Sequence, residues 1–145
     1  MQAAGTWKGD FQTYLEDGRG HSTTVDLPAD EGGADLGPSA LELCVLSLAG
    51  CITTIFALVA KKRRLRFEAM RVELEADRPQ GSPTIASVEG VLRVVTTAPA
   101  DDVETALNIT LRTCPVGVLF EHAHVPVRVR AMVSPPEVPR RGPSK

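Results

Sequence analysis

The sequence predicts an α+β fold with the element order β-β-α-β-β-α-α-β, and three observations predict it. Several segments alternate apolar and polar residues, as strands with one solvated face do. Residues 39–60 include a single charged residue, Glu42, which predicts a long helix that is apolar nearly all round. From Asp101 to Cys114 the apolar residues recur at helical three- and four-residue steps, which predicts a second helix.

Length and composition predict one domain. The chain has 145 residues, of which 43% are apolar and 23% are charged, both ordinary values for a globular protein. Residues 1–133 carry the periodic segments, while residues 134–145 (SPPEVPRRGPSK) are Pro-rich and predict a disordered tail. The net charge of −2 gives no general attraction to nucleic acid or to anionic lipid.

The cysteines and the N-terminus predict a cytoplasmic protein. Three cysteines are an odd number, which argues against a secreted disulfide framework and for reduced thiols. Residues 1–10 have no basic start and no apolar run, so they do not read as a signal peptide.

The first half of the chain predicts a hairpin, a loop and the long helix. Residues 6–15 alternate, residues 16–20 (EDGRG) form a turn and residues 22–27 return as a second strand. Residues 28–38 are acidic and Gly-rich, which predicts a loop. Ser39 followed three residues later by Glu42 is a capping-box pattern, and it predicts a helix over residues 40–64.

The second half predicts a further hairpin, two helices and a last strand. Residues 68–76 and 84–95 alternate on either side of a Pro- and Gly-containing turn, so we expect an antiparallel pair. Pro115 interrupts the second helix and predicts a short helix over residues 115–122, followed by a strand over residues 125–133. The long helix has more apolar surface than one thin sheet can cover. We therefore expect an antiparallel sheet wrapped around it, in an intertwined or closely packed homodimer.

The long apolar stretch also has a membrane interpretation. Residues 39–60 are long enough to span a bilayer, and the basic run at 61–64 resembles a cytoplasmic flank. Polar residues inside the stretch, and flanking strands that each need a surface to bury, argue against it. We favour the central helix of a soluble fold, with residues 61–66 as a solvated helix end rather than a nucleic-acid patch.

Two cysteines stand out against the ordinary expectation that a free cysteine packs as a small hydrophobe. Cys51 lies within the long helix and Cys114 ends the second, both on apolar stripes that must face inward, so both can reach one core. Cys114 also precedes Pro115 at a helix start, where unpaired backbone N–H groups favour a thiolate. Gly50 leaves room beside Cys51 for a substrate or a neighbouring backbone.

Three segments carry a resemblance to a known family. Residues 37–43 (GPSALEL), 47–51 (SLAGC) and 113–116 (TCPV) resemble the OsmC/Ohr family, the osmotically inducible and organic hydroperoxide resistance proteins. The second cysteine follows the first by 63 residues (114 − 51), close to the family's spacing. The resemblance covers residues 5–133. It implies the OsmC-like fold and a thiol peroxidase without metal or organic cofactor.

The resemblance implies a role for each of the two cysteines. The Cys51 thiolate would attack the distal oxygen of a hydroperoxide and become a sulfenic acid, and Cys114 would condense with it to a disulfide. A dithiol or thiol reductant would reset the protein, and apolar walls would favour organic hydroperoxides. The alternative is a redox-sensing or small apolar ligand-binding protein on the same fold, without efficient turnover.

A reactive thiolate in an apolar helix needs a nearby cation. The family uses an arginine of the N-terminal hairpin, which Arg19 matches; the alternative is a solvated turn residue. Glu42 matches the family's helix-start glutamate, thought to hold that arginine. On a straight helix Glu42 faces away from Cys51 and lies about 13 Å from it along the axis. Glu42 could then contribute to the Cys51 site only if that site is shared with a second chain or if the first turn of the helix is irregular. The alternative role of Glu42 is helix capping.

The remaining candidates carry weaker signals. Cys44 lies seven residues before Cys51, about 10 Å away along the helix, so we expect it to pack rather than react. His122 and His124 flank Ala123, and on a strand such a pair can bind a metal. We expect them to be solvated, because no third ligand has a suitable spacing.

Overall fold

The computed structural model describes residues 1–136, which form two compact units, residues 1–47 and residues 48 onward. The helix α1 (Ala40–Arg63) begins in the first unit and contributes most of its length to the second. The prediction of a single domain over residues 1–133 therefore stays a prediction.

The first unit contains a three-stranded antiparallel sheet made of β1 (Ala4–Gly9), β2 (Gln12–Glu16) and β3 (Ser22–Val25). The expected single strand over residues 6–15 is wrong, because the chain reverses between β1 and β2. Gly9 (φ 125°) and Asp10 (φ 43°) adopt positive φ there, and the Trp7 indole N–H donates to the Asp10 carbonyl at 2.9 Å. The chain thus starts β-β-β-α rather than β-β-α.

Asp26 organises the loop between β3 and α1. Its buried carboxylate accepts backbone N–H groups of Leu27, Ala34 and Leu36 at 2.8, 3.2 and 3.3 Å. A short 3₁₀ helix, η1 (Ala29–Glu31), lies inside the loop. Gly37 passes so close to Thr24 that a Cβ there would collide with the Thr24 carbonyl oxygen. The predicted loop is therefore an ordered segment folded around one carboxylate.

The capping box at the start of α1 is confirmed. The Ser39 N–H donates to Glu42 Oε2 at 2.7 Å, and the Glu42 N–H donates to Ser39 Oγ at 3.3 Å. At the other end Arg64 takes a left-handed conformation (φ 59°), which stops the helix one residue before its predicted end.

The second unit contains a sheet in the order β4-β5-β6, made of β4 (Ala69–Asp77), β5 (Ser87–Val95) and β6 (Val127–Ser134). The β4–β5 pair is antiparallel, as predicted, but β6 runs parallel to β5, so the expectation of a wholly antiparallel sheet is wrong. The helices α2 (Ala100–Thr113) and α3 (Pro115–His122) form the crossover that returns the chain in the same direction. Ser134 still belongs to β6, and most of the predicted tail, residues 137–145, lies outside the described residues.

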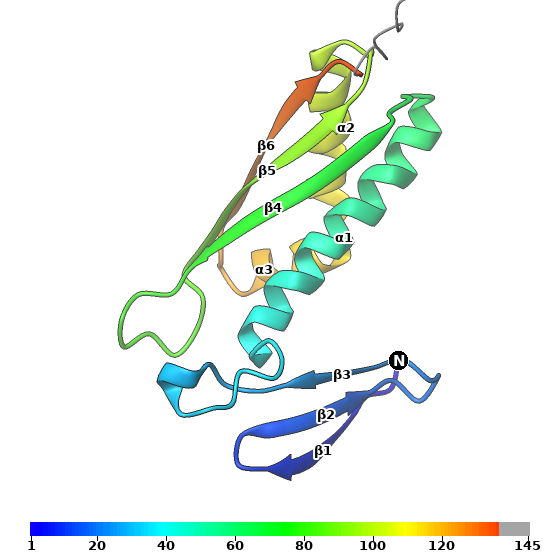
Figure 1. Ribbon diagram of the computed structural model, residues 1–145. Helices are drawn as coiled ribbons and strands as arrows, with labels where there is room; N and C mark the ends of the chain where they lie inside the picture. The colour runs from blue at the N-terminus through cyan, green and yellow to red at the C-terminus, as the bar shows by residue number, and fades with distance from the viewer. Residues whose placement is uncertain (137–145) are drawn as a thin grey trace, which may run out of the picture. The chain divides into compact units, whose positions relative to one another are not determined.

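The core of the second unit lies between the sheet and two helices. The helices α1 and α2 cover the same face of the sheet (Figure 1), where the inward residues of β5 meet them. Its buried members are Phe56, Val59, Ala60, Leu92, Val94, Val103, Ala106 and Leu107. By length and composition α1 could also cross a membrane, but only 28% of its most apolar 18-residue segment is buried within the chain.

Candidate active site

Cys114 occupies the junction between two helices. Its N–H donates to the Thr110 carbonyl at 2.8 Å and ends α2, while its extended backbone (φ −68°, ψ 112°) makes it the N-cap of α3. Pro115 takes the first helical position, where a missing N–H costs nothing. The Cys114 sulfur then accepts the Gly117 N–H at 3.4 Å, as a capping side chain does.

The structure brings Cys51 and Cys114 into contact. The Cys114 thiol is fully buried and donates its hydrogen to Cys51, whose side chain is partly exposed. Burial, and then this hydrogen bond, raise the pKa of Cys114 from about 9.0 to about 11, while the N–H groups of Gly117 and Val116 act in the opposite direction. Cys114 is therefore the member of the pair that keeps its proton.

A cavity of about 490 Å³ adjoins Cys114 in the second unit. Cys114 and Gly117 form part of its wall, and Cys51 is not among the residues that line it. The other lining residues are Leu48, Ile52, Leu111, Glu121, His124, Val125, Pro126, Val127 and Arg128. The cavity thus offers polar and apolar wall in similar amounts, with the apolar part contributed by residues such as Leu48, Ile52 and Leu111.

Arg19 is exposed in the turn between β2 and β3. Its guanidinium pairs with Asp17 through Nη2 at 2.9 Å and Nε at 3.0 Å, and His21 Nδ1 lies 2.7 Å from the same carboxylate. The hydrogen bonds from His21 and then Arg19 lower the pKa of Asp17 to about 2. Arg19 lies in the first unit and Cys51 in the second, so its role as the cation beside Cys51 stays a prediction.

Glu42 is exposed and engaged in the capping box at the start of α1. The Ser39 N–H and then the Ser39 hydroxyl lower the pKa of its carboxyl, which is the expected effect of donors on a carboxylate. Its capping alternative is therefore realised, and a second role beside the arginine stays a prediction. Cys44 was expected to pack, but it is exposed.

His122 and His124 do not form the strand pair that a metal site would need. His122 ends α3, and His124 (φ 59°) lies in the turn before β6, where it lines the cavity. Within residues 1–136, no group of three or more histidine, cysteine or acidic side chains could hold a metal ion.

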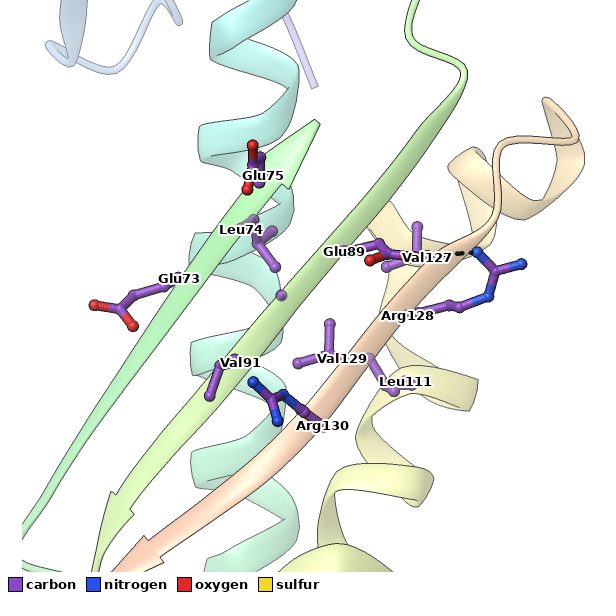
Figure 2. Close-up of a pocket in the computed structure, with 11 residues that line it drawn as sticks. Glu73, Leu74, Glu75, Glu89, Val91, Leu111, Val127, Arg128, Val129 and Arg130 are labelled. Atoms are coloured by element: carbon purple, nitrogen blue, oxygen red, sulfur yellow. Dashed lines mark hydrogen bonds and ion pairs between the residues drawn. The ribbon is translucent and has the colours of Figure 1, made fainter. Parts of the chain in front are cut away.

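A second hollow of about 730 Å³ lies along the sheet and contains neither cysteine. Figure 2 shows charged side chains around it, including the Arg128–Glu89 ion pair at 3.4 Å. Gly90 lies in its wall, and a Cβ there would collide with the Glu73 carbonyl oxygen. With charged walls and no nucleophile, this hollow is a weaker candidate than the cavity beside Cys114.

Two features of the site were not predicted from the sequence. The Gly117 N–H bond to Cys114 has a local signal, since a capping side chain reaches the N–H three residues on and Cys-Pro-Val-Gly has that spacing. The cavity wall at residues 124–128 has no such signal, because it depends on how β6 returns beside β5.

Comparisons with known proteins agree with this fold. The sequence model of the OsmC-like protein family matches residues 32–130. An OsmC-like protein from Mycoplasma pneumoniae superposes with a TM-score of 0.81 at 12% identity, over 91% of this chain and 95% of that one. An organic hydroperoxide resistance protein from Elizabethkingia anophelis gives 0.70 at 17% identity, over 92% and 94%. An organic hydroperoxide resistance protein OsmC from Legionella pneumophila gives 0.66 at 15% identity, over 92% and 97%.

Among curated proteins, none matches the sequence significantly. At identities below one fifth, the solved structures show likeness of fold alone. They confirm the expected α+β fold of this type.

Proposed function

Since this chain belongs to the OsmC-like protein family, we propose that it is a cysteine-based peroxidase that reduces organic hydroperoxides. The observation that carries the proposal is the contact between the thiols of Cys51 and Cys114 next to a partly apolar cavity. These residues are 63 positions apart (114 − 51), so the fold and not the local sequence brings them together. Structures of this fold include proteins named for organic hydroperoxide resistance, which supports the substrate class.

The inequality of the two thiols supports Cys51 as the attacking residue. Cys114 stays protonated and donates a hydrogen bond to the Cys51 sulfur, so Cys114 itself is not the nucleophilic thiolate. Cys51 is also the more exposed of the two, as the residue that meets the peroxide must be. The thiolate is the nucleophilic form of cysteine.

The proposed reaction has two chemical steps. The Cys51 thiolate attacks the distal peroxide oxygen, the O–O bond breaks, and the alkoxide leaves and takes a proton to become an alcohol. Cys51 is then a sulfenic acid. In the second step the Cys114 sulfur attacks the Cys51 sulfur, its proton and the departing hydroxide form water, and a disulfide joins the two residues. Two electrons from an external dithiol or two thiols restore the reduced pair.

The surroundings of this pair fit an alkyl hydroperoxide better than hydrogen peroxide. Leu48, Ile52 and Leu111 contribute apolar wall to the adjoining cavity, and such wall favours an alkyl group over water. In the active form we propose a cytoplasmic homodimer, in which Arg19, positioned by Glu42, provides the cation that the thiolate needs. The proposed chemistry requires no metal or organic cofactor.

Substitution of the two cysteines tests this proposal. We expect Cys51→Ser to lower hydroperoxide consumption, measured with a dithiol reductant, to the uncatalysed rate, because the nucleophile is lost. Cys114→Ser should still react once and stop at the Cys51 sulfenic acid, which dimedone traps for mass spectrometry. Cys44→Ser is the matched control and should keep full activity. Undiminished consumption by Cys51→Ser would end the peroxidase proposal.

A redox sensor on the same fold is the second candidate. The observation that favours it is the pairing of Arg19 with Asp17, which engages the cation assigned to Cys51. A sensor would form the disulfide slowly and only once with a stoichiometric hydroperoxide, whereas a peroxidase would turn over many times while reductant lasts.

A further inference from the structure

We infer that the cavity beside Cys114 binds a small-molecule thiol reductant, which attacks the Cys114 sulfur of the disulfide and releases Cys51 as a thiolate. The inference rests on the proposed function, because it concerns the disulfide formed there. It adds the site of the reductant, the sulfur that is attacked and the residue that keeps the path open.

The position of the cavity relative to the two sulfurs indicates which sulfur the reductant attacks. A thiolate attacks a disulfide along the S–S axis, from the side opposite the departing sulfur. Cys114 lines the cavity and Cys51 does not, so the cavity lies on the Cys114 side of the pair. A thiol held there approaches Cys114 with Cys51 as the departing group.

The size and lining of the cavity indicate the class of reductant. A volume of about 490 Å³ is that of a small-molecule site, and α1 and α2 contribute apolar wall through Leu48, Ile52 and Leu111. The facing wall carries both charge signs, through Glu121 and Arg128. This lining suits a thiol with a short apolar arm and a polar end.

The raised pKa of Cys114 favours the same direction. A thiol of higher pKa is a poorer leaving group in disulfide exchange. Burial and the Cys51 contact raise the pKa of Cys114 to about 11, so departure of Cys114 would be slow. Attack at Cys114 makes Cys51 the departing group of the first exchange, which directly regenerates the thiolate that the next hydroperoxide requires. The departure of Cys114 is left to the second exchange.

Gly117 leaves one side of the Cys114 sulfur free of a side chain. A Cβ at residue 117 would lie 3.4 Å from Cys114 Cβ and 3.6 Å from Sγ, which is ordinary van der Waals contact, so a methyl group would fit there and cover the sulfur from this side. The helical backbone does not itself require glycine at this position. Because Cys114 is fully buried in the reduced protein, the reductant must also displace part of the wall, and α3 has no buried residue to hold it rigidly.

The two exchange steps balance. The reductant thiolate forms a bond to the Cys114 sulfur, the Cys51–Cys114 bond breaks, and its electron pair leaves on Cys51. A second reductant thiolate then attacks the reductant sulfur of this mixed disulfide, releases the oxidised reductant as a disulfide and leaves Cys114, which takes up a proton.

Mapping the mixed disulfide tests which sulfur is attacked. The Cys44→Ser protein is oxidised with diamide or, in parallel, with cumene hydroperoxide, treated briefly with 2-mercaptoethanol and quenched in acid. Peptide mass spectrometry should find the mercaptoethanol adduct on Cys114. An adduct on Cys51 would overturn the inference. A disulfide formed by diamide but not by the hydroperoxide would contradict the proposed function alone, and no disulfide with either oxidant would contradict both.

A substitution at Gly117 tests the path. We expect Gly117→Ala to slow reduction of the disulfide by 2-mercaptoethanol by about tenfold, because the added methyl displaces the attacking sulfur. The disulfide is formed beforehand with diamide, so the measurement reports reduction alone. Val118→Ile enlarges the same helix outside the cavity lining and should leave the reduction rate unchanged. Equal reduction rates in Gly117→Ala and wild type would overturn the inference.

Discussion

At the scale of single residues, Cys114 does three things at once. It ends α2, caps α3 through its sulfur and contacts Cys51. Sulfur is a weak acceptor compared with the oxygens of the residues preferred at helix N-caps, so this position gives up some capping energy to place a thiol. The same burial that holds the sulfur next to Cys51 also keeps it protonated.

The protonated state of Cys114 predicts how stability depends on pH. The thiol pKa is raised from about 9.0 in the unfolded chain to about 11 in the folded protein. Above the lower value the unfolded chain loses this proton while the folded protein keeps it, so the free energy of unfolding falls as pH rises from 9.0 to about 11. We expect the urea midpoint of Cys114→Ser to fall less over this range than that of wild type, because serine does not titrate there. Parallel midpoints in the two proteins would show that Cys114 is not the group responsible.

At the scale of elements, the loop before α1 depends on Asp26. Its carboxylate satisfies three backbone N–H groups between β3 and the capping box. We expect Asp26→Asn to lower the free energy of unfolding by about 2 kcal/mol, because an amide group then faces donors that need an acceptor. Urea denaturation measures this, and limited proteolysis should find new cleavage within residues 27–38. Asp30→Asn, an exposed change in the same loop, is the control, and equal losses in both variants would contradict a special role for Asp26.

The elements that could be predicted from the sequence are those with a local cause. The capping box fixes the start of α1, and Pro115 separates α2 from α3 at the predicted residue. The division of residues 6–15 into two strands was missed because the alternation continues through the reversal at Gly9-Asp10, although Gly-Asp is itself a hairpin-turn signal. The parallel direction of β6 was missed because alternation is the same in parallel and antiparallel strands. The two predicted helices between β5 and β6 were the available signal, since a parallel pair needs such a crossover.

The features of the candidate site also divide into those that could be predicted from the sequence and those that could not. The meeting of Cys51 and Cys114 was expected from their apolar helical stripes, and the structure brings them together. The exposure of Cys44 was not expected, since a cysteine in an apolar helix gives no sign of which stripe its own chain leaves uncovered. The cavity wall beyond α3 is also non-local, because it forms only when β6 pairs with β5.

At the scale of the whole molecule, α1 is more apolar than its own chain requires. Only 28% of its most apolar 18-residue segment is buried, and Leu58 keeps 50% of its surface exposed. If this side of α1 stayed in water, the protein would lose a large part of the free energy that burial of its apolar side chains can provide. A second copy of this chain or a membrane could cover it. The capping box and the core formed with the sheet and α2 are features of a helix in a water-soluble fold, and they favour a second copy.

A charged substitution on the uncovered side of α1 tests this interpretation. We expect Leu58→Glu to weaken self-association by about 3 kcal/mol, roughly a hundredfold in Kd, because an unpaired carboxylate would be buried against the second copy. Analytical ultracentrifugation should show a wild-type dimer in buffer without detergent and a monomer for Leu58→Glu. Met132→Glu is the control, since Met132 is 42% exposed and contacts the Arg93 guanidinium on the charged face of β6. A detergent-free monomer for wild type would contradict the dimer, and wild type recovered only from membranes would favour the spanning helix. If Leu58→Glu and Met132→Glu lost dimerisation equally, the exposed side of α1 would not be its specific cause.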